Sequence, residues 1–151
     1  MKLDKYAKRR NFSKTTEPLP KIKTGKKEKL IFVIHRHAAT HLHYDLRLEW
    51  KGTLMSWAVP KQPANKINEK RLAVRVEDHP IDYAGFEGTI PAGEYGAGKV
   101  KIWDKGCWIP ESVKKDKIVF ELAGKKLKGK FALIKFKNQP KNWLFFKAKS
   151  D

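Results

Sequence analysis

The chain has very little of what would place a protein in a membrane or outside the cell. Among its 151 residues there is a single cysteine, Cys107, so no internal disulfide can form. No apolar run approaches the length of a membrane-spanning helix, and the N-terminus lacks the apolar segment of a secretory signal. We therefore expect a cytoplasmic protein that makes no contact with a membrane.

Acidic residues are also scarce relative to basic ones. The chain has 34 Lys and Arg residues against 16 Asp and Glu residues, which gives a formal net charge of +18. A charge this large on a small chain predicts a polyanionic partner such as nucleic acid. Charge shows attraction and not chemistry, so a solvated lysine surface remains an alternative. Mutual repulsion between such surfaces favours a monomer.

The length predicts one domain, with a core of useful size, preceded by a basic arm. Residues 1–28 carry many lysines and few apolar side chains, and we expect this arm to be partly mobile in the free protein. Leu3, Tyr6 and Phe12 are the residues that could hold it against the body. Residues 29–151 then form the folded domain.

From residue 30 onward, short segments of alternating apolar and polar residues are separated by turn residues. We expect strands at 31–36, 42–50, 54–59, 71–76, 99–103, 118–122, 127–136 and 143–147. We also expect tight turns at 51–52 and 104–106, and a long irregular stretch at 77–98. Several short strands at this spacing, with no long segment of helical period, are typical of an all-β sandwich or barrel.

The stretch 32–50 concentrates residues that bind metals and phosphates. It contains four of the chain's five histidines, namely His35, His37, His41 and His43. Leu42 to Trp50 alternates strictly, and a strand with this pattern carries His43, Asp45 and Arg47 on one face. An imidazole, a carboxylate and a guanidinium on one face suit a divalent metal beside a phosphate.

A helix is the alternative for this stretch, because His37, His41 and Asp45 are spaced i, i+4 and i+8. The period-two apolar pattern from Leu42 onward favours the strand. If the strand that ends at His37 pairs with it, then His37, His43 and Asp45 offer two imidazoles and one carboxylate, which suit Mn, Fe or Zn. Spacing alone leaves ordinary polar strand residues as an equal alternative.

Five segments together resemble the polynucleotide 3′-phosphoesterase family, whose members include modules of bacterial DNA ligase D and free-standing proteins. The segments are 32–37, 42–49, 56–61, 71–80 and 87–98, and residues 142–147 also fit. The resemblance implies a compact antiparallel β-barrel with little helix. It also implies a manganese-dependent hydrolase that heals 3′ ends during non-homologous end joining. Such an enzyme removes a terminal ribonucleoside from a primer strand and then hydrolyses the 3′-phosphate to a 3′-hydroxyl.

The resemblance also assigns roles to individual residues. It places Mn²⁺ on His37, His43 and Asp45, a donor set that Co²⁺ and Zn²⁺ also suit. It places the phosphate at Arg47 and His79, with Tyr83 beside them. It assigns accessory roles in the active site and the arm to Lys61, Arg71, Glu77, Arg10, Asn11 and Glu17. The implied partners are a DNA primer–template, a separate ATP-dependent DNA ligase and a repair polymerase.

Two features of the sequence depart from the family pattern. Asn11 stands where the family often has Asp, which leaves open whether the phosphomonoesterase step is retained. His35 and His41 are not typical of the family, and we interpret neither of them as a metal ligand.

Two other classes of function remain as alternatives. A non-catalytic barrel that binds single strands would use exposed, stacked aromatics, whereas most aromatics here alternate into strand cores. The other class is a zinc hydrolase of small phosphoesters. The net charge of +18 disfavours it, because a small substrate does not need so strong an electrostatic attraction.

Overall fold

The computed structural model describes residues 2–22 and 29–150. Its strands are β1 (Leu30–Ala38), β2 (Leu42–Trp50), β3 (Thr53–Val59), β4 (Arg71–Pro80), β5 (Gly88–Ile90), β6 (Gly98–Val113), β7 (Lys117–Ala123), β8 (Lys128–Lys135) and β9 (Asn142–Lys147). The helices in these residues are a single turn of α-helix, α1 (Asp4–Lys8), and a 3-10 turn, η1 (Ile81–Gly85). None of the described helices is long and apolar enough to cross a bilayer.

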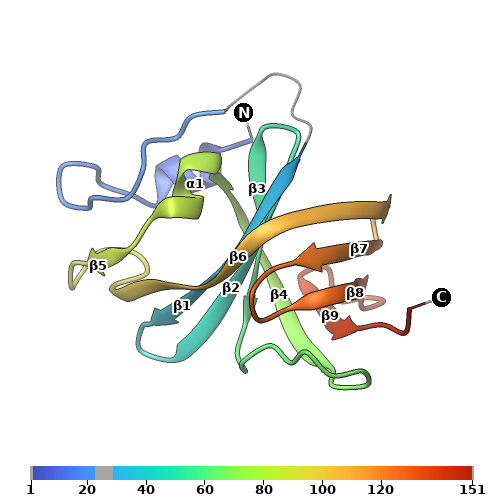
Figure 1. Ribbon diagram of the computed structural model, residues 1–151. Coiled ribbons are helices and arrows are strands. Elements are labelled where there is room, and N and C mark those ends of the chain that lie inside the picture. The colour runs from blue at the N-terminus through green and yellow to red at the C-terminus, as the bar shows by residue number, and fades with distance from the viewer. Residues whose placement is uncertain (1, 23–28, 151) are drawn as a thin grey trace.

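The strands form one antiparallel sheet that closes on itself (Figure 1). The order is β1-β2-β3-β4-β9-β8-β7-β6, and a further pairing of β1 with β6 joins the two ends. The short strand β5 adds to β6 outside this ring of eight. The structure therefore confirms the expected all-β fold, an antiparallel barrel with almost no helix.

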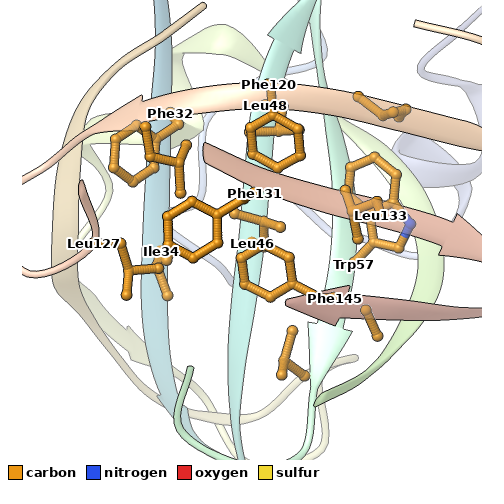
Figure 2. Packing of buried hydrophobic residues seen from close by; sticks show 14 of the residues in the cluster. Phe32, Ile34, Leu46, Leu48, Trp57, Phe120, Leu127, Phe131, Leu133 and Phe145 are labelled. Carbon is orange, nitrogen blue, oxygen red and sulfur yellow. The ribbon is translucent and has the colours of Figure 1, made fainter. Parts of the chain in front are cut away.

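The barrel interior is filled by large apolar side chains (Figure 2). Trp57, Phe120, Phe131 and Phe145 have essentially no exposed surface there. The alternation along β2 explains part of this core, because every second side chain of a strand points to the same face. Leu46 is one of those inward side chains, and its neighbours in sequence point outward.

A second apolar cluster lies outside the barrel and covers part of its outer surface. Leu3 and Tyr6 of the N-terminal arm are fully buried in it, packed with Tyr83 and Phe86 of the η1 region. Figure 1 shows α1 and η1 together on this side of the molecule. Residues 23–28 of the predicted arm lie outside the described residues. Because the arm covers this face, the outward side chains of Asp45 and Arg47 on β2 are buried as well, whereas His43 is partly exposed.

The predicted turn at 104–106 is wrong, since these residues lie within the long strand β6. Gly106 is required there for close approach and not for a turn: a Cβ on it would lie 2.1 Å from the carbonyl oxygen of Ala123 on β7. Asp104 is buried, and its carboxylate accepts hydrogen bonds from the backbone N–H groups of residues 125, 126 and 127. Gly106 therefore lets β7 approach β6 closely, and Asp104 holds the β7–β8 connection against β6.

The predicted irregular stretch at 77–98 is also partly wrong. Residues 77–80 continue β4, and 88–90 form β5. The β4 continuation matters for function, because the register pairs Leu54 of β3 with His79. A β-bulge between Leu54 and Ser56 precedes this pairing, and bulges re-aim side chains at a sheet rim.

Candidate active site

A cavity of about 310 Å³ opens on the outer face of the barrel, between the strands and the N-terminal arm. It is lined by polar and charged side chains from β1, β2, β4, η1, the arm and the loop before β6. Those side chains belong to Arg10, His37, His43, Asp45, Arg47, Glu77, His79, Tyr83 and Tyr95. Most of the residues singled out from the sequence therefore meet in one place, although they come from distant parts of the chain.

Two histidines and a carboxylate form a compact donor cluster at one side of this cavity. The β1–β2 register places His37 directly opposite His43, with ring centroids 4.7 Å apart. His37 Nδ1 lies 3.5 Å from Asp45 Oδ2, and His43 Nε2 lies 3.3 Å from Asp45 Oδ1. One ligand atom from each residue falls within 4.8 Å of the others. Among the described residues, this is the cluster with metal-binding geometry.

The second nitrogen of each imidazole is held by a backbone carbonyl, and this fixes the tautomers. His37 Nε2 donates to Gly96 O at 2.6 Å, and His43 Nδ1 donates to His41 O at 3.0 Å. A carbonyl can only accept, so in the neutral rings the lone pairs of His37 Nδ1 and His43 Nε2 face Asp45. Metal-ligating histidines are oriented in this way. The cluster therefore fits a divalent transition metal.

The electrostatics of Asp45 agree with that fit. Burial by itself raises the pKa of its carboxyl, but the charge of Arg47, together with the hydrogen bonds that His37 and His43 donate when their rings are protonated, outweighs burial and holds the pKa well below the usual value. The pKa of His43 is raised, because Asp45 outweighs the lowering effect of burial. Asp45 is therefore an anion that attracts positive charge into the space between the two imidazoles.

Arg47 lies next to this cluster with one donor unused. The side chain is buried; its Nε donates to His35 Nδ1 at 3.2 Å and its Nη2 donates to Asp45 Oδ2 at 3.4 Å. The guanidinium lies 4.8 Å from the ring centroid of Tyr83. Its Nη1 is buried without a hydrogen-bond partner among the described residues. A buried, unpaired donor on a cavity wall favours the binding of an anion.

His79 also lines this cavity, and its ring is neutral. Its Nδ1 donates to Glu77 O at 2.9 Å, and its Nε2 accepts from Arg10 Nη2 at 3.3 Å. Because arginine has no acceptor atom, this contact assigns the lone pair to Nε2. Burial first, and then the positive charges of Arg47 and Arg10, lower the pKa of His79 well below its usual value.

The arm contributes directly to the cavity through Arg10 and Glu17. Arg10 donates from Nε to Glu17 Oε2 at 3.0 Å and from Nη1 to Glu77 Oε2 at 3.2 Å. Tyr83 donates its hydroxyl to the same Glu17 oxygen at 2.6 Å, and burial raises the pKa of that hydroxyl. Asn11 is exposed, and its side-chain oxygen accepts from Ser13, so it does not line the cavity.

Lys61 and Arg71 lie at the two ends of the β3–β4 connection, outside the cavity lining. The Lys61 side chain is exposed. Arg71 donates to the carbonyl of Gln62 at 2.9 Å and forms an ion pair with Glu69. The structure therefore does not bring these two predicted residues together with Glu77 and the other members of the site.

Sequence reasoning overlooked two members of this region. His35 lies outside the donor cluster, but it connects Arg47 to the backbone, since its Nδ1 accepts from Arg47 Nε and its Nε2 donates to Phe86 O at 3.0 Å. Burial and the charge of Arg47 lower the pKa of His35 to about 3. Its position two residues before His37 on one strand face was a usable signal. Tyr95, in the glycine-rich loop, also lines the cavity, and no pattern in the sequence singled it out.

Comparison with known proteins identifies one family, through both a family model and individual relatives. The family model of the DNA ligase D 3′-phosphoesterase domain matches residues 35–135. The multifunctional non-homologous end joining protein LigD of Pseudomonas aeruginosa is 46% identical over 160 residues, covering 97% of this chain and 18% of that protein. LigD of Mycolicibacterium smegmatis is 47% identical over 161 residues, covering 98% of this chain and 21% of that protein. LigD of Mycobacterium tuberculosis is 42% identical over 153 residues, covering 99% and 20% respectively. The chain thus spans about a fifth of the length of these curated relatives.

The donor cluster generates a direct prediction about metal binding. His43→Ala removes one of three donors, so we expect the affinity for Mn²⁺ measured by calorimetry to fall at least ~10-fold. His41→Ala is the matched control, because His41 is an exposed histidine two residues away that contributes only its backbone carbonyl. Circular dichroism of both variants checks that the fold is kept. Unchanged Mn²⁺ affinity in folded His43→Ala would exclude His43 as a ligand.

Proposed function

The chain belongs to the DNA ligase D 3′-phosphoesterase domain family, and from this premise we propose that it is a manganese-dependent hydrolase that heals DNA 3′ ends. It removes a 3′-terminal ribonucleoside from a primer strand to leave a 3′-phosphate, and then hydrolyses that phosphate to a 3′-hydroxyl. The observation that supports this most is the shared carboxylate of Asp45. It contacts both imidazoles of the donor cluster and the guanidinium of Arg47, so one phosphate can meet metal and arginine together.

The chemistry divides between the bound ion and the side chains. His37, His43 and Asp45 would hold a divalent cation, which would supply Lewis-acid stabilisation of a phosphate oxygen and would make water a better nucleophile. Arg47 offers Nη1, which has no partner among the described residues, to one non-bridging oxygen. Nη2 can bind a second non-bridging oxygen if it gives up its hydrogen bond to Asp45. Two parallel charge-assisted hydrogen bonds of this kind fix the orientation of phosphorus for in-line attack.

His79 supplies the proton for the leaving oxygen in this proposal. It is neutral in the free protein because it is buried beside Arg10 and Arg47. A phosphate bound between these arginines offsets their charges, so substrate binding raises the affinity of His79 Nε2 for a proton. His79 Nε2 takes up this proton from solvent. As water adds to phosphorus and releases a proton to solvent, the P–O5′ bond of the terminal ribonucleoside breaks and the 5′ oxygen takes the proton from His79 Nε2.

In the second step the 3′-phosphate remains on the same donors. Water adds to phosphorus and releases a proton to solvent, the P–O3′ bond breaks, and the 3′ oxygen takes a proton from His79 Nε2. Arg10 and Glu17 hold the arm at this wall of the cavity. Asn11 is exposed and lies outside the lining, and we propose that the same side chains contact the phosphate in both steps.

We propose a primer–template duplex as the substrate, bound through its backbone with little sequence preference. The net charge of +18 supports this, because phosphate contacts supply most of the affinity of non-specific DNA binding. The names of the relatives refer to non-homologous end joining. We therefore propose that the healed end passes to an ATP-dependent DNA ligase and a repair polymerase, and that the chain acts as a monomer.

Arg47→Ala and His79→Ala test the division of roles. We expect both variants to keep Mn²⁺ affinity while turnover of a primer–template with one 3′-terminal ribonucleotide falls ~10²–10³-fold, the usual cost of one transition-state contact. Arg36→Ala is the matched control, since Arg36 is exposed on β1 and does not line the cavity. Loss of Mn²⁺ binding in His79→Ala would make His79 a ligand, and full turnover in either site variant would remove that residue from the mechanism.

His35 provides a second test, because it holds Arg47 and does not itself line the cavity. His35→Ala releases Arg47 Nε, and we expect kcat to fall ~10-fold with Mn²⁺ affinity kept. Glutamine can accept from Arg47 Nε and donate to the carbonyl of Phe86, so His35→Gln should recover most of kcat. If His35→Gln were as slow as His35→Ala, His35 would not act by positioning Arg47.

A further inference from the structure

Tyr95 stands apart from the other aromatic residues of the protein. It is 47% exposed, and it is the one aromatic among the large apolar side chains that are exposed in the described part of the chain. It also lines the cavity that holds Asp45 and Arg47. An aromatic ring that is left open to solvent at the edge of a phosphate-binding cavity offers a stacking surface to the nucleotide that carries the phosphate.

The loop that carries Tyr95 holds the ring in a fixed place. Backbone hydrogen bonds join Glu94 N to Pro91 O and Ala97 N to Glu94 O, both at 3.1 Å. The next residue, Gly96, has a φ of +77° and accepts the hydrogen bond from His37 Nε2. The same loop thus orients a residue of the donor cluster and the Tyr95 ring, so the two are fixed relative to each other.

Arginines of the arm add positive charge to this ring. Arg9 Nη1 donates to the Tyr95 hydroxyl at 2.9 Å, and its guanidinium carbon lies 5.0 Å from the ring centroid. The guanidinium carbon of Arg10 lies 5.5 Å from the same centroid. Glu77 binds both arginines through its two carboxylate oxygens, at 3.2 Å each. The Tyr95 ring therefore lies beside two guanidinium groups that Glu77 holds in place. Aromatic rings and guanidinium groups together bind nucleobases by stacking and charge.

We propose that Tyr95 and Arg9 form a binding subsite for the base of the 3′-terminal ribonucleoside, the group that leaves in the first step. This inference depends on the proposed function. In a duplex, each internal base is covered on both faces by its neighbours, whereas the terminal base of the primer strand has one free face. Tyr95 lies next in sequence to the residue that holds His37, so it borders the side of the cavity at which the scissile phosphate binds.

The subsite predicts different effects on the two steps. After the ribonucleoside has left, the base that remains is attached on the other side of the phosphate, one nucleotide further from the ring. Loss of Tyr95 should therefore slow removal of the ribonucleoside more than it slows hydrolysis of a 3′-phosphate. Stacking on one aromatic side chain is worth enough for an effect of about 10-fold.

A cycle that combines a change in the protein with a change in the substrate tests the contact itself. The two substrates are a primer–template ending in one ribonucleotide and the same duplex ending in an abasic ribose. We expect the wild-type protein with Mn²⁺ to lose about 10-fold in kcat/KM on the abasic substrate. Tyr95→Ala should lose about 10-fold on the normal substrate and show no further loss on the abasic one. Tyr95→Phe keeps the ring and should restore the dependence on the terminal base. Ile109→Ala, an exposed apolar residue outside the cavity, is the control.

Two results would overturn the subsite. The first is that the losses in kcat/KM from Tyr95→Ala and from the abasic substrate are additive, which would show that Tyr95 and the base do not interact. The second is an equal loss on ribonucleotide and 3′-phosphate primers, which would show that Tyr95 acts through Arg10 or the phosphate. In either case the wild-type protein still turns over the ribonucleotide primer, and the proposed function stands. Absence of metal-dependent turnover by the wild-type protein would overturn the subsite and the proposed function together.

Discussion

The rest of the site depends on the contacts between the buried carboxylate of Asp45 and the cationic or donor groups around it. An isolated anion is costly to bury, and this one is tolerated because His37, His43 and Arg47 surround it. Those partners are also the groups that a metal-assisted phosphoesterase requires. A cation between the imidazoles would add positive charge beside the Asp45 carboxylate. An anion bound by the unpaired Nη1 of Arg47 would then offset that positive charge.

The N-terminal arm makes this burial possible. Strand β2 lies on the surface of the barrel, and its outward face would be solvated without the cluster of Leu3, Tyr6 and Tyr83 above it. Within that cover, acidic and basic side chains alternate, since Glu17 binds Arg10 and Arg10 binds Glu77. The low-dielectric setting strengthens each of these contacts, and the same setting would strengthen contacts to a phosphate. The arm is therefore a wall of the candidate active site as well as a basic extension.

The sequence was most informative where a single strand determined the outcome. The alternation along Leu42–Trp50 predicted that His43, Asp45 and Arg47 share a face, and the structure brings them together. It was least informative where distant segments meet. The role of Gly106 depends on a backbone carbonyl of β7, and the partner of His35 depends on the register of β1 with β2 and on a carbonyl beyond η1. Neither contact leaves a periodic trace in the sequence.

We propose that a metal on the donor cluster and Arg47 act together on one phosphate at a DNA 3′ end. The most direct test is release of phosphate from two duplexes of identical sequence, one with a 3′-phosphate and the other with a 5′-phosphate, each with Mn²⁺ or with a chelator. We expect release from the 3′-phosphate alone, and only with Mn²⁺. Equal release from both ends, release that persists in chelator, or no release from the 3′ end by the metal-loaded protein would contradict it.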